Sequence, residues 1–128
     1  FDEARERLGE RLVQFGYADA FGEYAAWLWA ADLLPVTSRH DFFGISVAEA
    51  AYCATHPLLP RRLAYPELIP DAVAEACFYP EEDDLAEAVA DALQSPPPEL
   101  APLRAALAEY DWPRMAPRYD RAMEAVSG

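Results

Sequence analysis

The stretch TSRHDFFGISVAEA, residues 37–50, joins a short apolar run to a helical pattern. The run at 33–37 predicts a strand, Gly44 closes the loop that follows, and the pattern from Ile45 to Cys53 predicts a helix. This order of strand, loop and helix is typical of α/β proteins with parallel strands. Ligands of such sheets bind outside the carboxyl ends of the strands, and the free N–H groups of a first helical turn attract anions. Residues 37–50 are therefore the first candidate for a ligand-binding segment.

The rest of the chain continues the alternation of short apolar runs and helical patterns. Pro35 lacks an N–H group for the ladder, which predicts an edge or strand-end position for its strand. Residues 61–70 are predicted to be a loop with a turn at 65–67. Three or four strands fall short of the about six of a complete doubly wound domain, so the chain is expected to be a fragment. The predicted strands are 12–16, 33–37, 56–59 and 77–79, and three of the predicted helices are 23–31, 45–53 and 84–94. A fourth helix is opened by Pro98 and carries Leu100, Leu103 and Leu107. A terminal helix follows Trp112-Pro113 and carries Met115, Tyr119 and Met123.

Composition indicates one globular domain and argues against some partners. The chain has 128 residues, of which 53% are hydrophobic, enough for a single core. No apolar run approaches the roughly 20 residues of a membrane-spanning helix. Residues 1–7 are charged and unlike a signal peptide, so we expect no membrane partner and a cytoplasmic location. The net charge is −13, and residues 71–99 hold nine acids and no base, a surface that repels nucleic-acid phosphates. Cys53 and Cys77 fit no zinc spacing and are expected to be buried thiols.

Two carboxylates of the candidate segment suggest a chemistry. Asp41 precedes the first helical turn and Glu49 follows eight positions later, a spacing that allows both to face one cleft. Carboxylates accept hydrogen bonds from sugar and ribose hydroxyls. Gly44 would let the backbone approach a ligand without an intervening Cβ. The residues alone also allow Asp41 to be a helix N-cap and Glu49 to be an ordinary exposed helix residue.

A longer set of motifs narrows the choice. The string His40-Asp41-Phe42-Phe43-Gly44, followed by the segments 49–53, 57–60 and 63–70, resembles the tRNA-queuosine α-mannosyltransferase family of retaining GT-B glycosyltransferases. The acid, seven residues, acid pattern is common to many glycosyltransferases, whereas Tyr65-Pro66-Glu67 is more specific. The resemblance covers roughly residues 12–94, with a looser match at 111–113.

The resemblance implies an α/β fold that is part of a Rossmann-like parallel sheet with C-terminal helices. Residues 1–128 would be one partial domain, with 1–94 from the donor-binding domain of a GT-B enzyme and 95–128 as a C-terminal helical segment. The N-terminal acceptor domain and the start of the donor domain would be absent. The implied reaction is transfer of mannose from GDP-mannose to queuosine in tRNA, with retention and without a required metal. The tRNA would bind through the missing N-terminal domain.

The resemblance also implies roles for individual residues. Asp41 would lie near the donor sugar and its phosphate, with His40 as a second catalytic candidate. Glu49 would hold the ribose hydroxyls of the donor. Backbone amides of the helix start would meet the sugar and the diphosphate; the donor-binding residues implied are Asp41, Phe43, Gly44, Ile45, Ser46 and Glu49.

Several side chains have two interpretations. His40 can serve as an acid, a base or a hydrogen-bond donor to a sugar hydroxyl, or it can orient the loop. Arg39 is a candidate phosphate contact or a surface residue, and Glu67 faces either the cleft or solvent. Of Phe42 and Phe43, at most one is expected to point to the core, and the other is a candidate for the lining of a sugar pocket. Core or interface packing is expected for Trp27, Trp29, Tyr119 and the two methionines, and a structural role for His56.

The chain departs from the family pattern at two positions. It has Asp41 where a glutamate is usual, and Ala54 where a glycine is usual after the cysteine. The alanine predicts ordinary helical or extended dihedrals at 54. Two other functions remain open: a retaining GT-B enzyme with another donor and a small-molecule acceptor, and a non-catalytic α/β interaction module. Apolar surface left by the missing half predicts self-association of the fragment.

Overall fold

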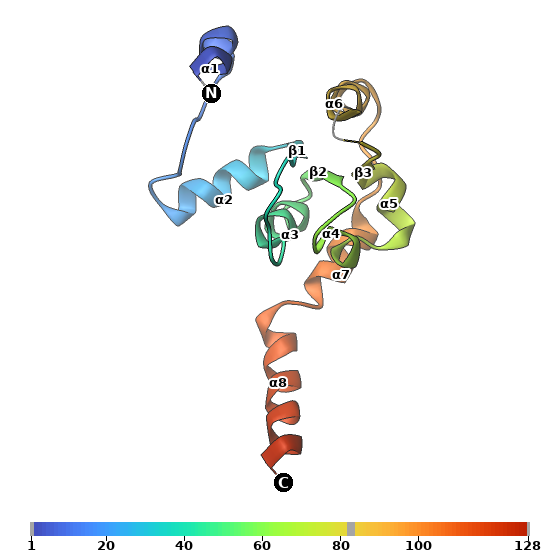
Figure 1. Ribbon diagram of the computed structural model, residues 1–128. Coiled ribbons are helices and arrows are strands. Elements are labelled where there is room, and N and C mark those ends of the chain that lie inside the picture. Colours follow the sequence, from blue (N-terminus) through green and yellow to red (C-terminus); the bar gives the residue numbers. More distant parts are fainter. Residues whose placement is uncertain (1, 82–83, 128) are drawn as a thin grey trace.

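The computed structural model describes residues 2–81 and 84–127, and three of its segments form a parallel sheet in the order β1-β2-β3 (Figure 1). Leu33 pairs with His56, and Leu59 pairs with Phe78. β1 lies at an edge, so the position predicted from Pro35 is confirmed. The α/β class with parallel strands is confirmed as well. The strands are β1 (Leu33–Pro35), β2 (His56–Pro60) and β3 (Phe78–Tyr79).

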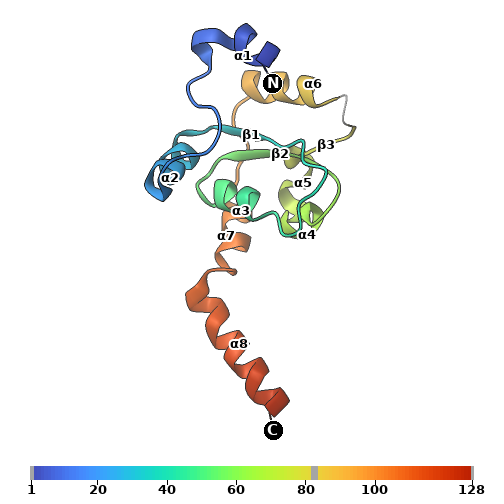
Figure 2. The same ribbon diagram turned by 60° about the vertical axis from the view of Figure 1, so that its left-hand side comes forward.

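Helices cover both faces of this sheet. Figures 1 and 2 show α3, α4 and α5 on one side and α6 on the other, with α7 beneath α3 and α5 and with α8 leading away from the body. The bounds are α1 Asp2–Leu8, the 3-10 turn η1 Gly9–Arg11, α2 Phe21–Ala30, α3 Ile45–Tyr52, α4 Tyr65–Leu68, α5 Asp71–Cys77, α6 Leu85–Gln94, α7 Ala101–Ala108 and α8 Trp112–Ser127. None of the helices within the described ranges combines the length and apolarity that a bilayer crossing demands.

The core lies between the sheet and the helices α3, α5 and α7. All five residues of β2 are buried, which is why this strand is an uninterrupted apolar run after His56. Leu59 and Leu103 are completely buried, and each such leucine contributes about 1.5–3 kcal/mol. The His56 ring bonds the carbonyl oxygen of Ala76 at 2.8 Å, which confirms its structural role. The core members are Val36, Val47, Ala51, Leu59, Tyr65, Ile69, Val73, Cys77, Leu100, Leu103 and Leu107.

The two cysteines are free thiols. Cys77 is completely buried, and burial raises the pKa of its thiol to about 11. Cys53 is half-buried. The expectation of a buried thiol is therefore confirmed in full for Cys77 and in part for Cys53.

The predicted strand at 12–16 is wrong. The segment is irregular, and Val13 and Phe15 are exposed to solvent. The guanidinium of Arg5 instead lies over the ring of Phe15, with its Cζ 4.7 Å from the ring centroid. A strand needs a neighbour for its backbone N–H and C=O groups, and within the described residues the sheet offers this segment none.

Several predicted boundaries also differ. Residues 61–70 contain the short helix α4, which has Pro66 in its first turn, where a missing N–H costs nothing. Helix α5 occupies 71–77, where no helix was predicted. Helix α7 starts at Ala101 with Pro102 in its first turn, so Pro98 does not open it. Glu82 and Asp83 of the acidic stretch lie outside the described residues.

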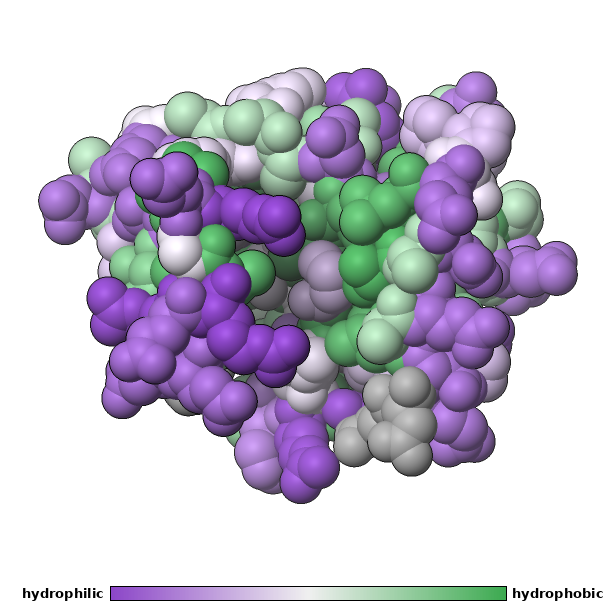
Figure 3. Space-filling model, turned by 90° about the horizontal axis from the view of Figure 1, so that it is seen from above, coloured by the Kyte–Doolittle hydropathy of each residue, from purple (hydrophilic) through white to green (hydrophobic). Residues whose placement is uncertain are grey.

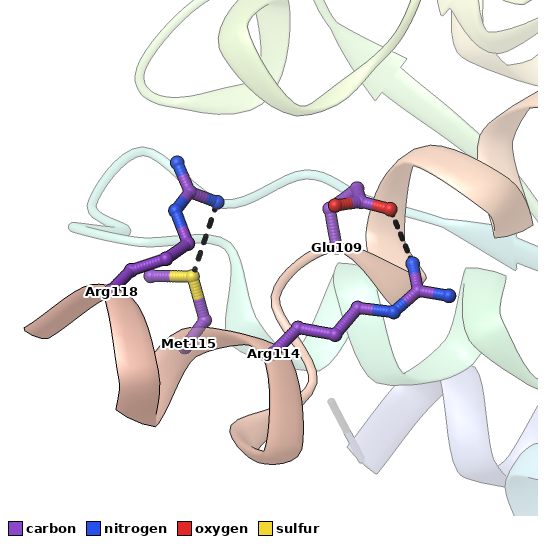
Figure 4. Close-up of polar contacts among 4 residues, drawn as sticks. All are labelled: Glu109, Arg114, Met115 and Arg118. Carbon is purple, nitrogen blue, oxygen red and sulfur yellow. Dashed lines mark hydrogen bonds and ion pairs between the residues drawn. The ribbon is translucent and has the colours of Figure 1, made fainter.

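The terminal helix exists, but of the three residues expected to pack only Met115 is half-buried, whereas Tyr119 and Met123 are not core residues. Tyr119 and Met123 are 56% and 71% exposed because α8 projects from the body. Trp112 and Pro113 form its first turn instead of preceding it. Two interactions between neighbouring side chains lie at the start of α8. Arg114 pairs with Glu109, and Arg118 donates to the sulfur of Met115 at 3.6 Å (Figure 4). Trp27 and Trp29 are likewise exposed and not core residues.

The face that carries α1 and α6 is hollowed. Figure 3 shows apolar residues gathered around a depression in the middle of this face, with polar residues around them. Apolar surface of this kind marks sites of contact with other protein segments.

Helix α3 ends at a strained residue. The Thr55 N–H donates to the Ala50 carbonyl and the Ala54 N–H to the Ala51 carbonyl, both at 3.0 Å, which is the Schellman arrangement. Ala54 has φ 70°, so the ordinary dihedrals predicted for it are wrong. The two bonds and the buried start of β2 impose this conformation, although the left-handed region costs a residue with a Cβ about 1–2 kcal/mol.

Replacing Ala54 with glycine is expected to raise the free energy of unfolding by about 1 kcal/mol, because glycine enters the left-handed region without a Cβ clash. Urea denaturation measures the change. Ala90→Gly, at an exposed position inside α6, is the control and is expected to lower the same quantity by roughly 0.5–1 kcal/mol. Equal losses of unfolding free energy at both positions would contradict the conclusion that the Ala54 backbone is strained.

Candidate functional site

The loop between β1 and α3 begins where the carboxyl end of β1 is anchored in the core. The Val36 N–H donates to the Leu58 carbonyl at 2.9 Å, and the buried Tyr79 hydroxyl donates to the Val36 carbonyl at 2.8 Å. Farther along, the Arg62 guanidinium donates to the carbonyls of Thr37 and Ser38. The loop therefore leaves the sheet at a fixed point.

Asp41 organises the turn that follows. One of its carboxylate oxygens accepts the Gly44 N–H at 2.7 Å and the Phe43 N–H at 3.2 Å, and the other accepts the Tyr65 hydroxyl at 3.0 Å. The Gly44 amide is the main cause that lowers the pKa of Asp41, and the Tyr65 and Phe43 bonds add to it. The carboxylate is thus turned back into its own loop, and both oxygens bind protein donors.

Tyr65 donates the third hydrogen bond that the Asp41 carboxylate accepts. Its side chain is completely buried at the start of α4. Burial raises the pKa of its hydroxyl, and the bond to Asp41 raises it further. The hydroxyl therefore stays protonated and donates. Because Tyr65 belongs to the hydrophobic core, this hydrogen bond joins the loop to the core.

Gly44 stands directly before α3 with φ 66°, in the left-handed region. A Cβ at this position would lie 2.6 Å from a methyl carbon of Leu68 and 3.3 Å from the Tyr65 ring. From the sequence, Gly44 was expected to let the backbone approach a ligand. The structure gives it an internal reason, since only glycine combines this dihedral with the close contact of α4.

The start of α3 presents backbone donors. The helix geometry leaves the N–H groups of Ile45, Ser46 and Val47 without acceptors inside the helix. The side chains of Ile45 and Ser46 are exposed, whereas Val47 is buried in the core. Together with the helix dipole, these amides favour an anion in front of the first turn.

A cleft of about 890 Å³ opens beside this helix start. Its walls come from α2, α3, α4 and the end of α7. Arg39, His40, Asp41, Gly44 and Ser46 do not line it. Phe42 and Phe43 are 87% and 73% exposed, so neither points to the core, which agrees with the expectation that at most one would. The predicted site residues that line the cleft are Phe42, Phe43, Ile45, Glu49 and Glu67.

Glu49 is the carboxylate of α3 that lines this cleft. One of its oxygens accepts the Tyr24 hydroxyl from α2 at 2.7 Å. Burial is the main cause that raises the pKa of Tyr24 to about 12, and the bond to Glu49 adds to it. A carboxylate accepts about four hydrogen bonds, so Glu49 retains capacity for a ligand.

Two residues of the site were not predicted from the sequence. Tyr65 is 24 positions from Asp41, and Tyr24 is 25 positions from Glu49. Periodicity gave Tyr24 only a place on a helix face, and no local pattern connects a tyrosine with an acid so distant. No group of three or more His, Cys, Asp and Glu within 2–81 and 84–127 is placed to hold a metal ion.

Comparison with known proteins identifies the family of this chain. The model of the family described as "Glycosyl transferases group 1" matches residues 3–111. The chain belongs to the group 1 glycosyl transferases. The expected GT-B class is thereby confirmed, and the three-stranded parallel sheet agrees with the Rossmann-like donor domain of a group 1 glycosyl transferase.

A relative with a named activity is found in Drosophila melanogaster. Its tRNA-queuosine alpha-mannosyltransferase is 40% identical over 70 residues, which cover 55% of this chain and 18% of the relative. The match therefore spans less than a fifth of the length of this relative. No solved structure matches the chain.

The Asp41 turn predicts a dependence of stability on pH. Folding lowers the pKa of Asp41, so its stabilisation is present above the ordinary value of 3.8 and is lost as the pH falls through the lowered value. Asp41→Asn removes the charge. The variant is expected to unfold more easily than the wild type near pH 6, with a difference that shrinks toward about pH 3.

Urea denaturation over this range measures the difference. Asp91→Asn, on the exposed side of α6, is the matched control and should show a constant, small difference. An Asp41→Asn difference that does not change with pH would contradict the role of the charged carboxylate.

Proposed function

We propose that this chain is part of the donor-binding domain of a longer retaining glycosyltransferase, which transfers mannose from GDP-mannose to queuosine in tRNA. The observation that carries the proposal is the position of Glu49, on the first helix after β1 and in the wall of a cleft of about 890 Å³. The similarity to the Drosophila tRNA-queuosine alpha-mannosyltransferase supports the choice of donor and acceptor.

The donor would bind along the start of α3. The Glu49 carboxylate would accept hydrogen bonds from the ribose hydroxyls. The amides of Ile45 and Ser46 would face the diphosphate, where the helix dipole stabilises negative charge. Phe42 and Phe43 would line the sugar side of the cleft.

The chemistry would rest on positioning and on the leaving group. Retaining transfer passes through a cation-like sugar centre while negative charge grows on the departing diphosphate. The amides at the helix start would stabilise that charge, and Asp41 would hold the loop that presents them. His40, which is exposed beside Asp41, would exchange a proton or bind a sugar hydroxyl. No metal is required in this scheme.

Arg39 and Glu67 have supporting roles in the proposal. Glu67 lies in the wall of the cleft and would accept a hydroxyl of the sugar. Arg39 is an exposed base of the loop and would approach a phosphate. The tRNA would bind through parts of the enzyme outside this chain. A cytoplasmic location would suit a tRNA acceptor and the two free thiols.

The test uses the full-length enzyme with queuosine-containing tRNA and GDP-mannose. Mass spectrometry of the digested tRNA is expected to show one added hexose on queuosine. Glu49→Ala is expected to reduce kcat/KM for GDP-mannose at least about tenfold, because the ribose loses a charged acceptor. Glu87→Ala, an exposed acid of α6, is the matched control and should leave the rate unchanged.

Each outcome decides between the functions that the sequence left open. A product that Glu49→Ala abolishes supports donor and acceptor together. Transfer from another nucleotide sugar to a small molecule would keep the glycosyltransferase and discard mannose and tRNA. Failure to bind any nucleotide sugar would favour the non-catalytic module, for which the structural argument is that the Asp41 carboxylate accepts three hydrogen bonds from its own protein.

A further inference from the structure

The cleft contains one carboxylate that another helix holds in place. Tyr24 lies on α2 and Glu49 on α3, and the two helices pack against each other. The hydroxyl of Tyr24 lies 2.7 Å from Oε2 of Glu49. Both residues line the cleft.

The position of α2 against α3 is itself fixed by buried contacts. The hydroxyl of Thr55, a residue only 1% exposed, lies 2.8 Å from the Leu28 carbonyl and 3.1 Å from the Ala31 carbonyl. The His56 N–H donates to the Asp32 carbonyl at 3.0 Å. The end of α2 is thus joined to the residues that follow α3, so the Tyr24 hydroxyl has a defined place beside Glu49.

We infer that Tyr24 is a positioning residue for donor binding, which fixes the Glu49 carboxylate so that its remaining acceptor capacity faces the ribose. The inference rests on the proposed function of Glu49. A glutamate on an exposed helix face samples several rotamers, and the bond from Tyr24 selects one of them before the ligand arrives. Such preorganisation strengthens binding because less freedom is lost on association.

Two features make Tyr24 suited to this role. Its ring makes a tilted aromatic contact with the ring of Phe21, with 6.3 Å between the ring centroids. Burial raises the pKa of its hydroxyl to about 12, and at neutral pH the protonated hydroxyl donates to the carboxylate.

The experiment compares Tyr24→Phe with the wild-type full-length enzyme. GDP and 2′,3′-dideoxy-GDP serve as the probes, and isothermal titration calorimetry measures their Kd. The variant keeps the ring and its contact with Phe21, so its Tm is expected to stay close to that of the wild type. We expect the Kd for GDP to rise about fivefold and the KM for GDP-mannose to rise with it, while kcat is unchanged.

The dideoxy probe separates positioning from a packing defect. It lacks the ribose hydroxyls that Glu49 would bind, so Tyr24→Phe should leave its Kd unchanged. In a Glu49→Ala background, Tyr24→Phe should have no further effect on GDP, because the two residues act as one unit. Tyr119→Phe, on the exposed α8, is the matched control and should bind both probes as the wild type does.

These measurements distinguish a failure of the inference about Tyr24 from a failure of the proposed function. Equal weakening of GDP and dideoxy-GDP by Tyr24→Phe would overturn the inference, since a distorted cleft explains both. An unchanged Kd for GDP in Tyr24→Phe, with weakening in Glu49→Ala, would overturn the inference and keep the proposed function. An unchanged Kd in Glu49→Ala would overturn the proposed role of Glu49 itself.

Discussion

The hydrogen bond from the buried Tyr65 hydroxyl to Asp41 is the constraint on which the candidate site depends. It ties an exposed loop to a side chain of the hydrophobic core, so the loop cannot move without disturbing α4. The same carboxylate collects the amides of Phe43 and Gly44 and thereby sets the residue at which α3 begins. The start of α3 in turn fixes which residue of that helix enters the cleft, and that residue is Glu49.

The other end of α3 carries a second constraint, and the two together determine the cleft. The Schellman arrangement at Ala54 turns the chain sharply into β2, and Thr55 then bonds the end of α2. The strained dihedral of Ala54 persists because the buried strand that follows outweighs it: five buried residues of β2 contribute more than one left-handed alanine costs. Helix α3 is thus held at both ends by buried groups, while the face between them lines the cleft.

The sequence predicted those parts of the fold that short-range patterns determine. Helices α3 and α6 and the strand β2 follow from periodicity and from an apolar run, and these were correct to within one or two residues. The segment 12–16 has the same apolar composition as a strand, but a strand also requires a neighbour, which composition does not encode. Likewise the acids of the site were found from their spacing, whereas Tyr24 and Tyr65 were not, because tertiary packing alone brings them to Glu49 and Asp41. The dihedral of Ala54 was missed since it is imposed by the junction with β2, against the preference of alanine itself.

The length of one side chain explains how the two acids divide their tasks. An aspartate two and three residues before the amides of Phe43 and Gly44 reaches both without leaving the loop, and this is the short-range geometry that favours aspartate in turns. A glutamate at 41 would carry its carboxylate one methylene farther, so it would have to leave at least one of the three donors that now bind it. Glu49 is the longer acid and stands on a helix face, where its carboxylate lines the cleft and, among the residues that the structure describes, accepts the Tyr24 hydroxyl. The shorter acid therefore shapes the loop, and the longer one remains to face a ligand.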